Sequence, residues 1–336
     1  MHAYIRGQGG EGGLGRLRVA PLQGDASTRS YARLRFDRAP STGEDGAGPP
    51  AWAGGSALVM DMPRMGDGPV IRDGKTYSAI AHLAEDAVPF VAIAATLREA
   101  GLAAPEIHAF DGADGLALIE DLGDVTFAAA LAAGLDQGML WNAALDVLIH
   151  LHRIRPPEAI TVTRFGGLAH EMPRYDGEVL ATEVDLLCDW YWPLKTRAAM
   201  PQGERERFHA LWRALIDEVA WRAGDTTTQH WVLRDFHSPN LIWRDGRAGL
   251  ERVGIIDVQD AQIGHAAYDL VSLAEDARLD VPKALRDQLL ERYCAAVFKD
   301  TTSEAAVQFR RAAAILGAQR NTKILGIFAR LAMRDG

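Results

Sequence analysis

The stretch WVLRDFHSPNLIW (residues 231–243) places Asp235 five residues before Asn240. A second acid, Asp257, closes the apolar run VGIID (residues 253–257). Phosphoryl transfer needs one carboxylate to orient the acceptor hydroxyl and accept its proton, and two further oxygen ligands to hold Mg²⁺ on the nucleotide phosphates. The spacing therefore fits a catalytic base, Asp235, with a metal-binding amide and a metal-binding carboxylate, Asn240 and Asp257, around one cleft.

The residues between these groups predict how they meet. Two short runs, 241–243 and 253–256, are rich in β-branched and aromatic residues, and the connection 244–252 is charged and contains two glycines available for positive φ. This pattern predicts a β-hairpin. A hairpin folds back on itself, so Asn240 at its entrance and Asp257 at its exit should meet at one end, toward which the preceding loop also opens.

A simpler interpretation of Asp-x-x-x-x-Asn is a turn, because both residue types bond to their own backbone. A carboxylate that closes a buried strand is costly without a partner, so Asp257 favours a site over a turn. Farther along, Asp269 begins an apolar stripe with helical period. We expect this acid to be structural, to cap that helix and to brace the Asp235 loop.

The N-terminal part predicts strands. Residues 17–22 and 31–36 alternate as a hairpin would, and the loop 24–30 between them has small side chains whose amides can approach phosphate closely. An ordinary hairpin turn explains the same loop, which carries a single glycine. The expected phosphate contacts are Ser27, Thr28 and Arg29.

The next strand, 57–60, departs from the protein-kinase pattern, because Val59-Met60-Asp61 stands where a lysine would bind the α- and β-phosphates. Either Arg29 supplies the charge, or the nucleotide sits differently, or activity is lost; the family resemblance given below favours the first. Residues 39–55 are too rich in Gly and Pro to pack and predict a mobile loop. Beyond them we expect a helix at 89–100, strands at 105–110 and 115–120, and mainly helices from Phe127, including one through Leu140–His152.

Several segments together resemble one family. They are Gly24–Tyr31, Val59–Pro63, Leu118–Asp124, Leu233–Trp243, Ile256–Ala261 and Tyr268–Leu273. In this order they look like the aminoglycoside/choline phosphotransferase family, and within it most like the bacterial anomeric sugar kinases that act on N-acetylmuramate and N-acetylglucosamine in cell-wall recycling. The resemblance runs from about Gly24 to the end of the chain.

The resemblance implies an α+β, protein-kinase-like bilobal fold. A small N-terminal antiparallel β-sheet lobe, residues 1–122, should bind the nucleotide, and a larger, mainly helical C-terminal lobe, residues 123–336, should carry the catalytic and substrate-binding groups. ATP and Mg²⁺ are the implied cofactors, and the segment 120–122 is the implied hinge whose backbone meets adenine. The further nucleotide contacts expected are Met60, Glu120 and Leu122.

The acceptor should contact the helical lobe. Residues 183–192 combine acids with aromatics, which suits a sugar, suits a cationic choline-like head equally, and is also typical of a packed core. The expected substrate contacts are Glu183, Trp190, Arg234 (for a substrate carboxylate), His237 and Asp260. For His237 a hydrogen bond that stabilises the loop is the alternative. A kinase for choline, an amino acid or an aminoglycoside, and a nucleotide-binding pseudokinase, remain the alternative functions.

Composition limits the partners. The 336 residues carry a formal net charge of −9, which argues against a surface for nucleic acid. Two cysteines predict a reducing compartment without a disulfide framework. We find no run of 18 apolar residues and no apolar signal core at the start, so we expect a cytoplasmic protein that binds a small molecule and no membrane. The oligomeric state does not follow from the sequence.

Overall fold

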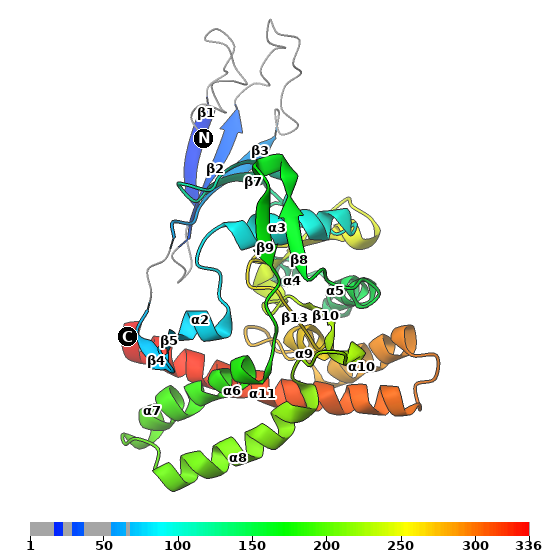
Figure 1. Ribbon diagram of the computed structural model, residues 1–336. Helices are drawn as coiled ribbons and strands as arrows, with labels where there is room; N and C mark the ends of the chain where they lie inside the picture. The colour runs from blue at the N-terminus through cyan, green and yellow to red at the C-terminus, as the bar shows by residue number, and fades with distance from the viewer. Residues whose placement is uncertain (1–16, 23–28, 37–54, 65–67, 336) are drawn as a thin grey trace, which may run out of the picture.

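The computed structural model describes residues 17–22, 29–36, 55–64 and 68–335 (Figure 1). Five antiparallel strands form the N-terminal sheet in the order β1 (Leu17–Leu22), β2 (Ser30–Phe36), β3 (Ser56–Asp61), β7 (Leu116–Glu120), β6 (Ile107–Asp111). The strands predicted from sequence are therefore confirmed. Most of the predicted mobile loop, and Ser27 and Thr28, lie outside the described residues.

Helix α3 (Val88–Glu99) connects the sheet to the rest of the molecule. Pro89 lies in its first turn, where a missing N–H costs nothing, and the chain leaves it through Gly101 at φ +81°. Its buried residues join Met60 and Ile119 of the sheet in one apolar core. The opposite side of α3 packs against the hairpin of β8 (Ala159–Val162) and β9 (Leu168–Glu171).

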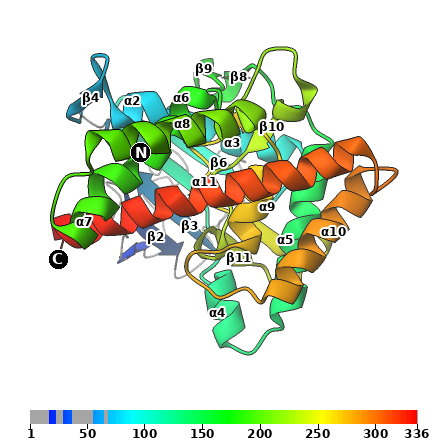
Figure 2. The same ribbon diagram turned by 90° about the horizontal axis from the view of Figure 1, so that it is seen from below.

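Helices dominate the remainder, as predicted. The helices are α2 (Tyr77–Ala81), α4 (Phe127–Ala132), α5 (Gln137–His152), α6 (Gly177–Leu186), the π-helical turn η2 (Leu187–Tyr191), α7 (Trp192–Thr196), α8 (Gln202–Val219), α9 (Ala267–Ala274), α10 (Lys283–Val297) and α11 (Glu304–Asp335). α11 runs across the face farthest from the sheet and packs on α6 and α9 (Figure 2). In the described part of the chain, no helix is both long and apolar enough to cross a membrane.

Short strand pairs in the helical part position the predicted site. β11 (Leu241–Trp243) pairs antiparallel with β12 (Val253–Ile255), with Leu241 opposite Ile255, which confirms the predicted hairpin. In its connection Gly246 and Gly249 have φ of +75° and +57°, a conformation that side chains with a Cβ rarely adopt. A second pair joins β10 (His230–Val232) to β13 (Gln262–Gly264). A two-stranded hairpin, β4 (Val70–Arg72) and β5 (Lys75–Thr76), precedes α2.

Candidate active site

The loop that follows β10, residues 233–240, is hydrogen-bonded to a side chain of α9. Both carboxylate oxygens of Asp269 accept backbone hydrogen bonds, from Leu233 N at 2.6 Å and from Arg234 N at 3.0 Å. Arg234 has a φ of +67°, so this bond fixes a turn that a non-glycine residue rarely adopts alone. Asp269 therefore braces the loop as expected. It does not cap α9, because it lies inside the first turn and the N-cap position is Ala266, which has no side-chain oxygen.

Asn240 and Asp257 meet at the open end of the β11–β12 hairpin. The Asn240 Nδ2 amide lies 3.3 Å from Asp257 Oδ2 and 3.1 Å from the backbone oxygen of Asp235. One amide therefore ties the loop carrying Asp235 to the strand end carrying Asp257. The chain turns at Asp257 with a φ of +63°, which lies outside the extended conformation of the strand. The predicted meeting of Asn240 and Asp257 is therefore present in the structure, and the Asp235 backbone contacts it; the role of the Asp235 carboxylate stays a prediction.

Arg29, at the start of β2, reaches this group from the sheet. Its Nη1 lies 2.5 Å from Asp257 Oδ1 and 2.7 Å from Gln259 Oε1. The Nε2 of Gln259 donates in turn to Asp257 Oδ1 at 2.9 Å and lies 3.3 Å from Asp260 Oδ2. Sequence reasoning missed Gln259. Its place between two acids in the motif Asp257-Val-Gln-Asp260 was the available signal, because an amide there can bond to both carboxylates.

A cavity of about 310 Å³ opens between the sheet and this group. Its apolar walls come from Leu58, Ile119, Leu122, Ile242 and Ile256, and its polar end from Arg29, Asn240 and Asp257. A slot with apolar walls and one polar, charged end suits a flat base with a phosphate chain.

Of two residues predicted to contact the nucleotide, Glu120 lies at this cavity and Met60 does not. Glu120 lines it, and its carboxylate joins Arg98 of α3 at 2.8 Å to Arg244 of the hairpin connection at 3.1 Å. Met60 has no exposed surface and packs in the apolar core. Leu58, on the same face of the strand, lines the cavity instead. The Met60 side chain is therefore closed to a nucleotide in this structure.

The oxygen groups fit a divalent cation of the Mg²⁺ type. A carboxylate and a side-chain amide are hard oxygen donors, which Mg²⁺ prefers together with phosphate and water oxygens. The positively charged guanidinium of Arg29 lies against the Asp257 carboxylate, so this carboxylate already faces a cation in the structure. Asn240 and Asp257 are therefore the residues that would hold the metal.

Two of the expected substrate contacts are closed to an acceptor. Glu183 has no exposed surface, and Arg234 is 3 % exposed. Their side chains form an ion pair, with Arg234 Nη2 at 2.5 Å from Glu183 Oε1, and the Lys323 ammonium of α11 binds the same oxygen at 2.8 Å. Arg234 also donates to the Ala81 carbonyl at 2.8 Å. The sequence analysis placed both residues at the acceptor because no local pattern indicates that Lys323, 140 residues from Glu183, pairs with it.

The other expected contacts differ in accessibility. Asp260 is partly exposed, accepts a bond from Ala84 N at 2.7 Å, and has a pKa raised by burial. His237 is partly exposed; its backbone bonds to Asp235 and Asn240, and burial lowers the pKa of its ring. Its Nδ1 is buried without a hydrogen-bond partner among the described residues. Trp190 is half-buried in η2.

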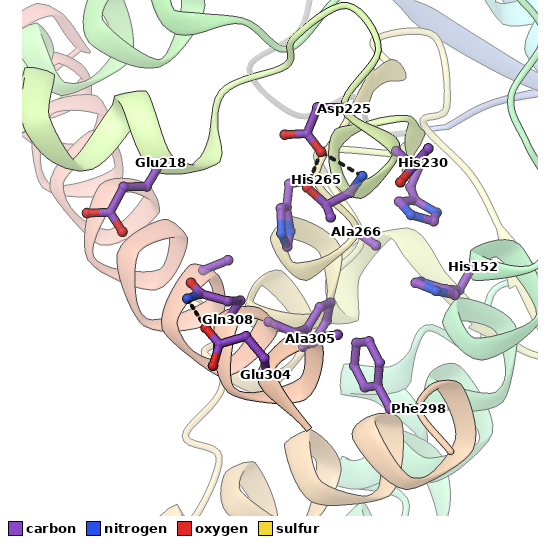
Figure 3. A pocket seen from close by; sticks show the side chains of 14 residues that line it. His152, Glu218, Asp225, His230, His265, Ala266, Phe298, Glu304, Ala305 and Gln308 are labelled. Carbon is purple, nitrogen blue, oxygen red and sulfur yellow. Dashed lines mark hydrogen bonds between the residues drawn. The ribbon is translucent and has the colours of Figure 1, made fainter. Parts of the chain in front are cut away.

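A second cavity, of about 610 Å³, is lined by side chains from α5, β10 and α11 and from the segments between them (Figure 3). His152, His230 and His265 line it, and the rings of His152 and His230 stack with centroids 4.3 Å apart. Burial lowers the pKa of His152 and of His265 to about 4, so both rings are neutral near pH 7. None of the nucleotide or acceptor residues predicted from sequence lines this cavity. The ring of His152 also lies 2.9 Å, through Nδ1, from the Tyr293 hydroxyl, so this histidine has a packing role.

An antiparallel sheet packs on a mainly helical part, and a cavity between them has Asn240 and Asp257 at its polar end. This combination defines a phosphotransferase of the protein-kinase-like class. The chain belongs to the phosphotransferase enzyme family, whose family model matches residues 58–307. It is similar to the N-acetylmuramate/N-acetylglucosamine kinase of Caulobacter vibrioides, with 35 % identity over 96 % of this chain and 84 % of the relative. The protein of the same name from Pseudomonas aeruginosa is 30 % identical over 95 % of this chain and 78 % of its own length. The chain is therefore a small-molecule kinase.

Solved structures agree on the fold. An ethanolamine kinase of Plasmodium vivax superposes with a TM-score of 0.55 at 12 % identity, covering 95 % of this chain and 77 % of that one. A choline/ethanolamine kinase family protein of Mesorhizobium loti gives 0.50 at 15 % identity, covering 97 % and 83 %. At such identities the likeness shows a shared protein-kinase-like architecture, which confirms the predicted fold class.

Proposed function

We propose that this protein transfers the γ-phosphate of ATP to the anomeric hydroxyl of N-acetylmuramate and N-acetylglucosamine. The observation that carries the kinase chemistry is the meeting of Asn240 and Asp257 at the polar end of the cavity, with the Asp235 backbone hydrogen-bonded to Asn240. The choice of acceptor is supported by relatives of that name at 30–35 % identity along nearly the whole chain. We also propose a cytoplasmic location, because ATP is the proposed donor, and a lobe boundary after Leu122, which the end of β7 at Glu120 supports.

In this mechanism Asp235 orients the acceptor hydroxyl and accepts its proton as the phosphoryl group transfers. The Asp269 brace keeps the loop, and therefore Asp235, in place. Asn240 and Asp257 would hold Mg²⁺, which neutralises charge on the β- and γ-phosphates when bound. The hinge backbone at Leu122 would meet adenine at the apolar end of the cavity.

Arg29 would supply the cation that a strand lysine supplies in protein kinases. Its guanidinium already lies at the polar end of the cavity, and moving from Asp257 to a phosphate exchanges one anionic partner for another. Asp260 and His237 are the proposed acceptor contacts, because both are partly exposed and neighbour the Asp235 group. Trp190 stays a prediction. The ion pair of Glu183 with Arg234 is proposed to hold the loop in position.

An acceptor panel tests the proposal. ADP release from Mg-ATP is measured with N-acetylmuramate, N-acetylglucosamine, choline, homoserine and kanamycin, and the product is identified by phosphorus NMR. We expect release with the two sugars and none with the methyl glycoside of N-acetylglucosamine, whose anomeric oxygen is blocked. Turnover of the glycoside would refute the anomeric site, and turnover of choline, homoserine or kanamycin alone would establish an alternative acceptor. Silence throughout, with ATP still binding, would identify a pseudokinase.

A further inference from the structure

Three side chains of different chemistry meet in the helical part, on elements that Figure 1 shows far from the sheet. Among the described residues, Asp185, Cys188 and His209 each offer one potential ligand atom, and these atoms lie within 4.8 Å of one another. Asp185 and Cys188 are buried, at 7 % and 1 % exposure, while the His209 side chain is 36 % exposed. The phosphotransfer chemistry proposed above uses none of the three.

The local structure explains why they meet. Asp185 lies at the end of α6 and Cys188 in the π-helical turn η2 that continues it, so the two are three residues apart on one helical face. π-helical turns are rare and often occur at functional sites. His209 comes from α8, which packs against α6. Its Nε2 lies 2.5 Å from Asp185 Oδ1, so the carboxylate and the imidazole are hydrogen-bonded to each other beside Cys188.

The surroundings orient the carboxylate and leave the position accessible. Arg72 of β4 donates to the other oxygen, Asp185 Oδ2, and lies 3.3 Å from the Thr182 hydroxyl. This bond fixes the carboxylate from outside, as outer-shell partners do around bound metals, and leaves Oδ1 for a ligand. A cavity of about 500 Å³, lined by both Asp185 and His209, connects the position to solvent. Cys188 is buried and forms no disulfide, so its sulfur has no covalent partner.

We propose that Asp185 Oδ1, Cys188 Sγ and His209 Nε2 bind one Zn²⁺ ion, with water from the adjoining cavity as the fourth ligand. A thiolate, an imidazole and a carboxylate form a donor set that suits Zn²⁺ and does not suit Mg²⁺. Binding releases the thiol proton to solvent and replaces the Asp185–His209 hydrogen bond by two metal–ligand bonds. Ligand atoms of a tetrahedral zinc site lie about 3.3–3.8 Å apart, so the two atoms now at 2.5 Å separate by about 1 Å.

The ion would act as a clip between α6 and α8. α6 also carries Glu183, whose buried ion pair with Arg234 supports the Asp235 loop, so the clip would stiffen a helix on which the active site rests. A ligand that binds the folded chain and not the unfolded one raises the apparent stability. We therefore expect zinc to raise the melting temperature without taking part in phosphoryl transfer.

Cobalt substitution tests the proposal directly. Tag-free protein is stripped with chelator, titrated with Co²⁺ and followed by absorption, and zinc is quantified in the protein as purified. We expect about one zinc per chain and, with Co²⁺, a sulfur-to-cobalt charge-transfer band in the near ultraviolet. Only a thiolate produces that band, so Co²⁺ bound at Asn240 and Asp257 does not contribute to it. Asp257→Ala should keep the band, which separates this test from the test of the kinase site.

Matched variants complete the test. Cys188→Ser should abolish the band, whereas Cys294→Ser, which alters the other buried free cysteine, should keep it. Loss of an outer-shell partner alone weakens metal binding by about 10–100-fold, so His209→Gln, at a half-exposed position, should weaken it by more than about a hundredfold. A wild-type protein without the band, or equal cobalt affinity in wild type and His209→Gln, would overturn the proposal.

Discussion

Replacing Glu183 by glutamine removes a negative charge that two buried cations share. Glu183 Oε1 accepts from Arg234 at 2.5 Å and from Lys323 at 2.8 Å, and Oε2 accepts from Tyr175 at 2.5 Å and from Gln319 at 3.1 Å. A glutamine keeps one acceptor oxygen, so its amide nitrogen must face either the two cations or the Tyr175 and Gln319 donors. In either orientation charged groups remain buried without full compensation.

The size of the loss follows from the same contacts. Breaking a buried ion pair by removing one partner costs about 3–5 kcal/mol. Burial alone would raise the pKa of Glu183, but Lys323 and Arg234 outweigh it and lower the pKa from 4.5 to about 2. A fall of that size in a buried carboxyl corresponds to about 3 kcal/mol of stability. We therefore expect Glu183→Gln to lower the free energy of unfolding by about 3–5 kcal/mol.

Urea unfolding of wild type and variant measures this difference, provided that both unfold in one two-state transition. The folded-state pKa of Glu183 lies below its unfolded value, so its contribution is present above pH 4.5 and is lost as the pH falls toward 2. The stability gap between wild type and Glu183→Gln should therefore narrow over that acid range. A constant gap would contradict the assignment of the effect to the carboxylate charge.

A glutamate in the first turn of the same helix provides the control. Glu178 is 43 % exposed and pairs with Lys75 at 3.3 Å, so Glu178→Gln should change stability by less than about 1 kcal/mol. If Glu183→Gln instead left the stability unchanged and raised only the KM for the sugar, Glu183 would be the substrate contact that the sequence suggested, and the positioning role would be refuted.

Substitutions at three further positions test the active site. Asp235→Asn should lower kcat by about 10²–10⁴-fold, while its affinity for ATP, measured by calorimetry, should stay unchanged. Turnover by this variant at the wild-type rate would exclude Asp235 as the base. Asp257→Ala should remove most of the thermal stabilisation by Mg-ATP, because the carboxylate ligand is lost; an undiminished thermal shift would place the metal elsewhere. Arg29→Met should raise the KM for ATP by about 10–100-fold, and Arg29→Lys, which keeps the charge, by less; equal KM values in all three proteins would rule out a phosphate contact.

Local patterns in the sequence predicted much of the fold and the centre of the site. Alternating and β-branched runs indicated β1, β2, β3, β6 and β7, and the glycine-containing connection between β11 and β12 indicated the hairpin. Hairpin geometry then required Asn240 and Asp257 to meet, because the two residues flank paired strands. These predictions succeeded because each depends on residues close together in the chain.

The sequence predicted less well which side chains are exposed to a ligand and which are covered by other parts of the chain. Strand alternation placed Met60 and Leu58 on one face, but only the packing of the core decides that Met60 is covered while Leu58 lines the cavity. Asp269 was recognised as a brace, but its place within the first turn of α9 depends on where the helix begins. The local motif allows Gln259 to bond to two acids, whereas its contact with Arg29 of the N-terminal part comes from 230 residues away.

The sequence alone determined the order of the chemical groups: an aspartate, an asparagine and a strand-ending aspartate, spaced so that one short hairpin brings them together. Only the tertiary structure decided which charges reach a ligand. Glu183 and Arg234 lie near the Asp235 loop in space, yet α11 covers them and supplies Lys323 as a partner. The physical reason is that burying a charge is so costly that distant segments must compensate it, and contacts between distant segments have no local pattern in the chain.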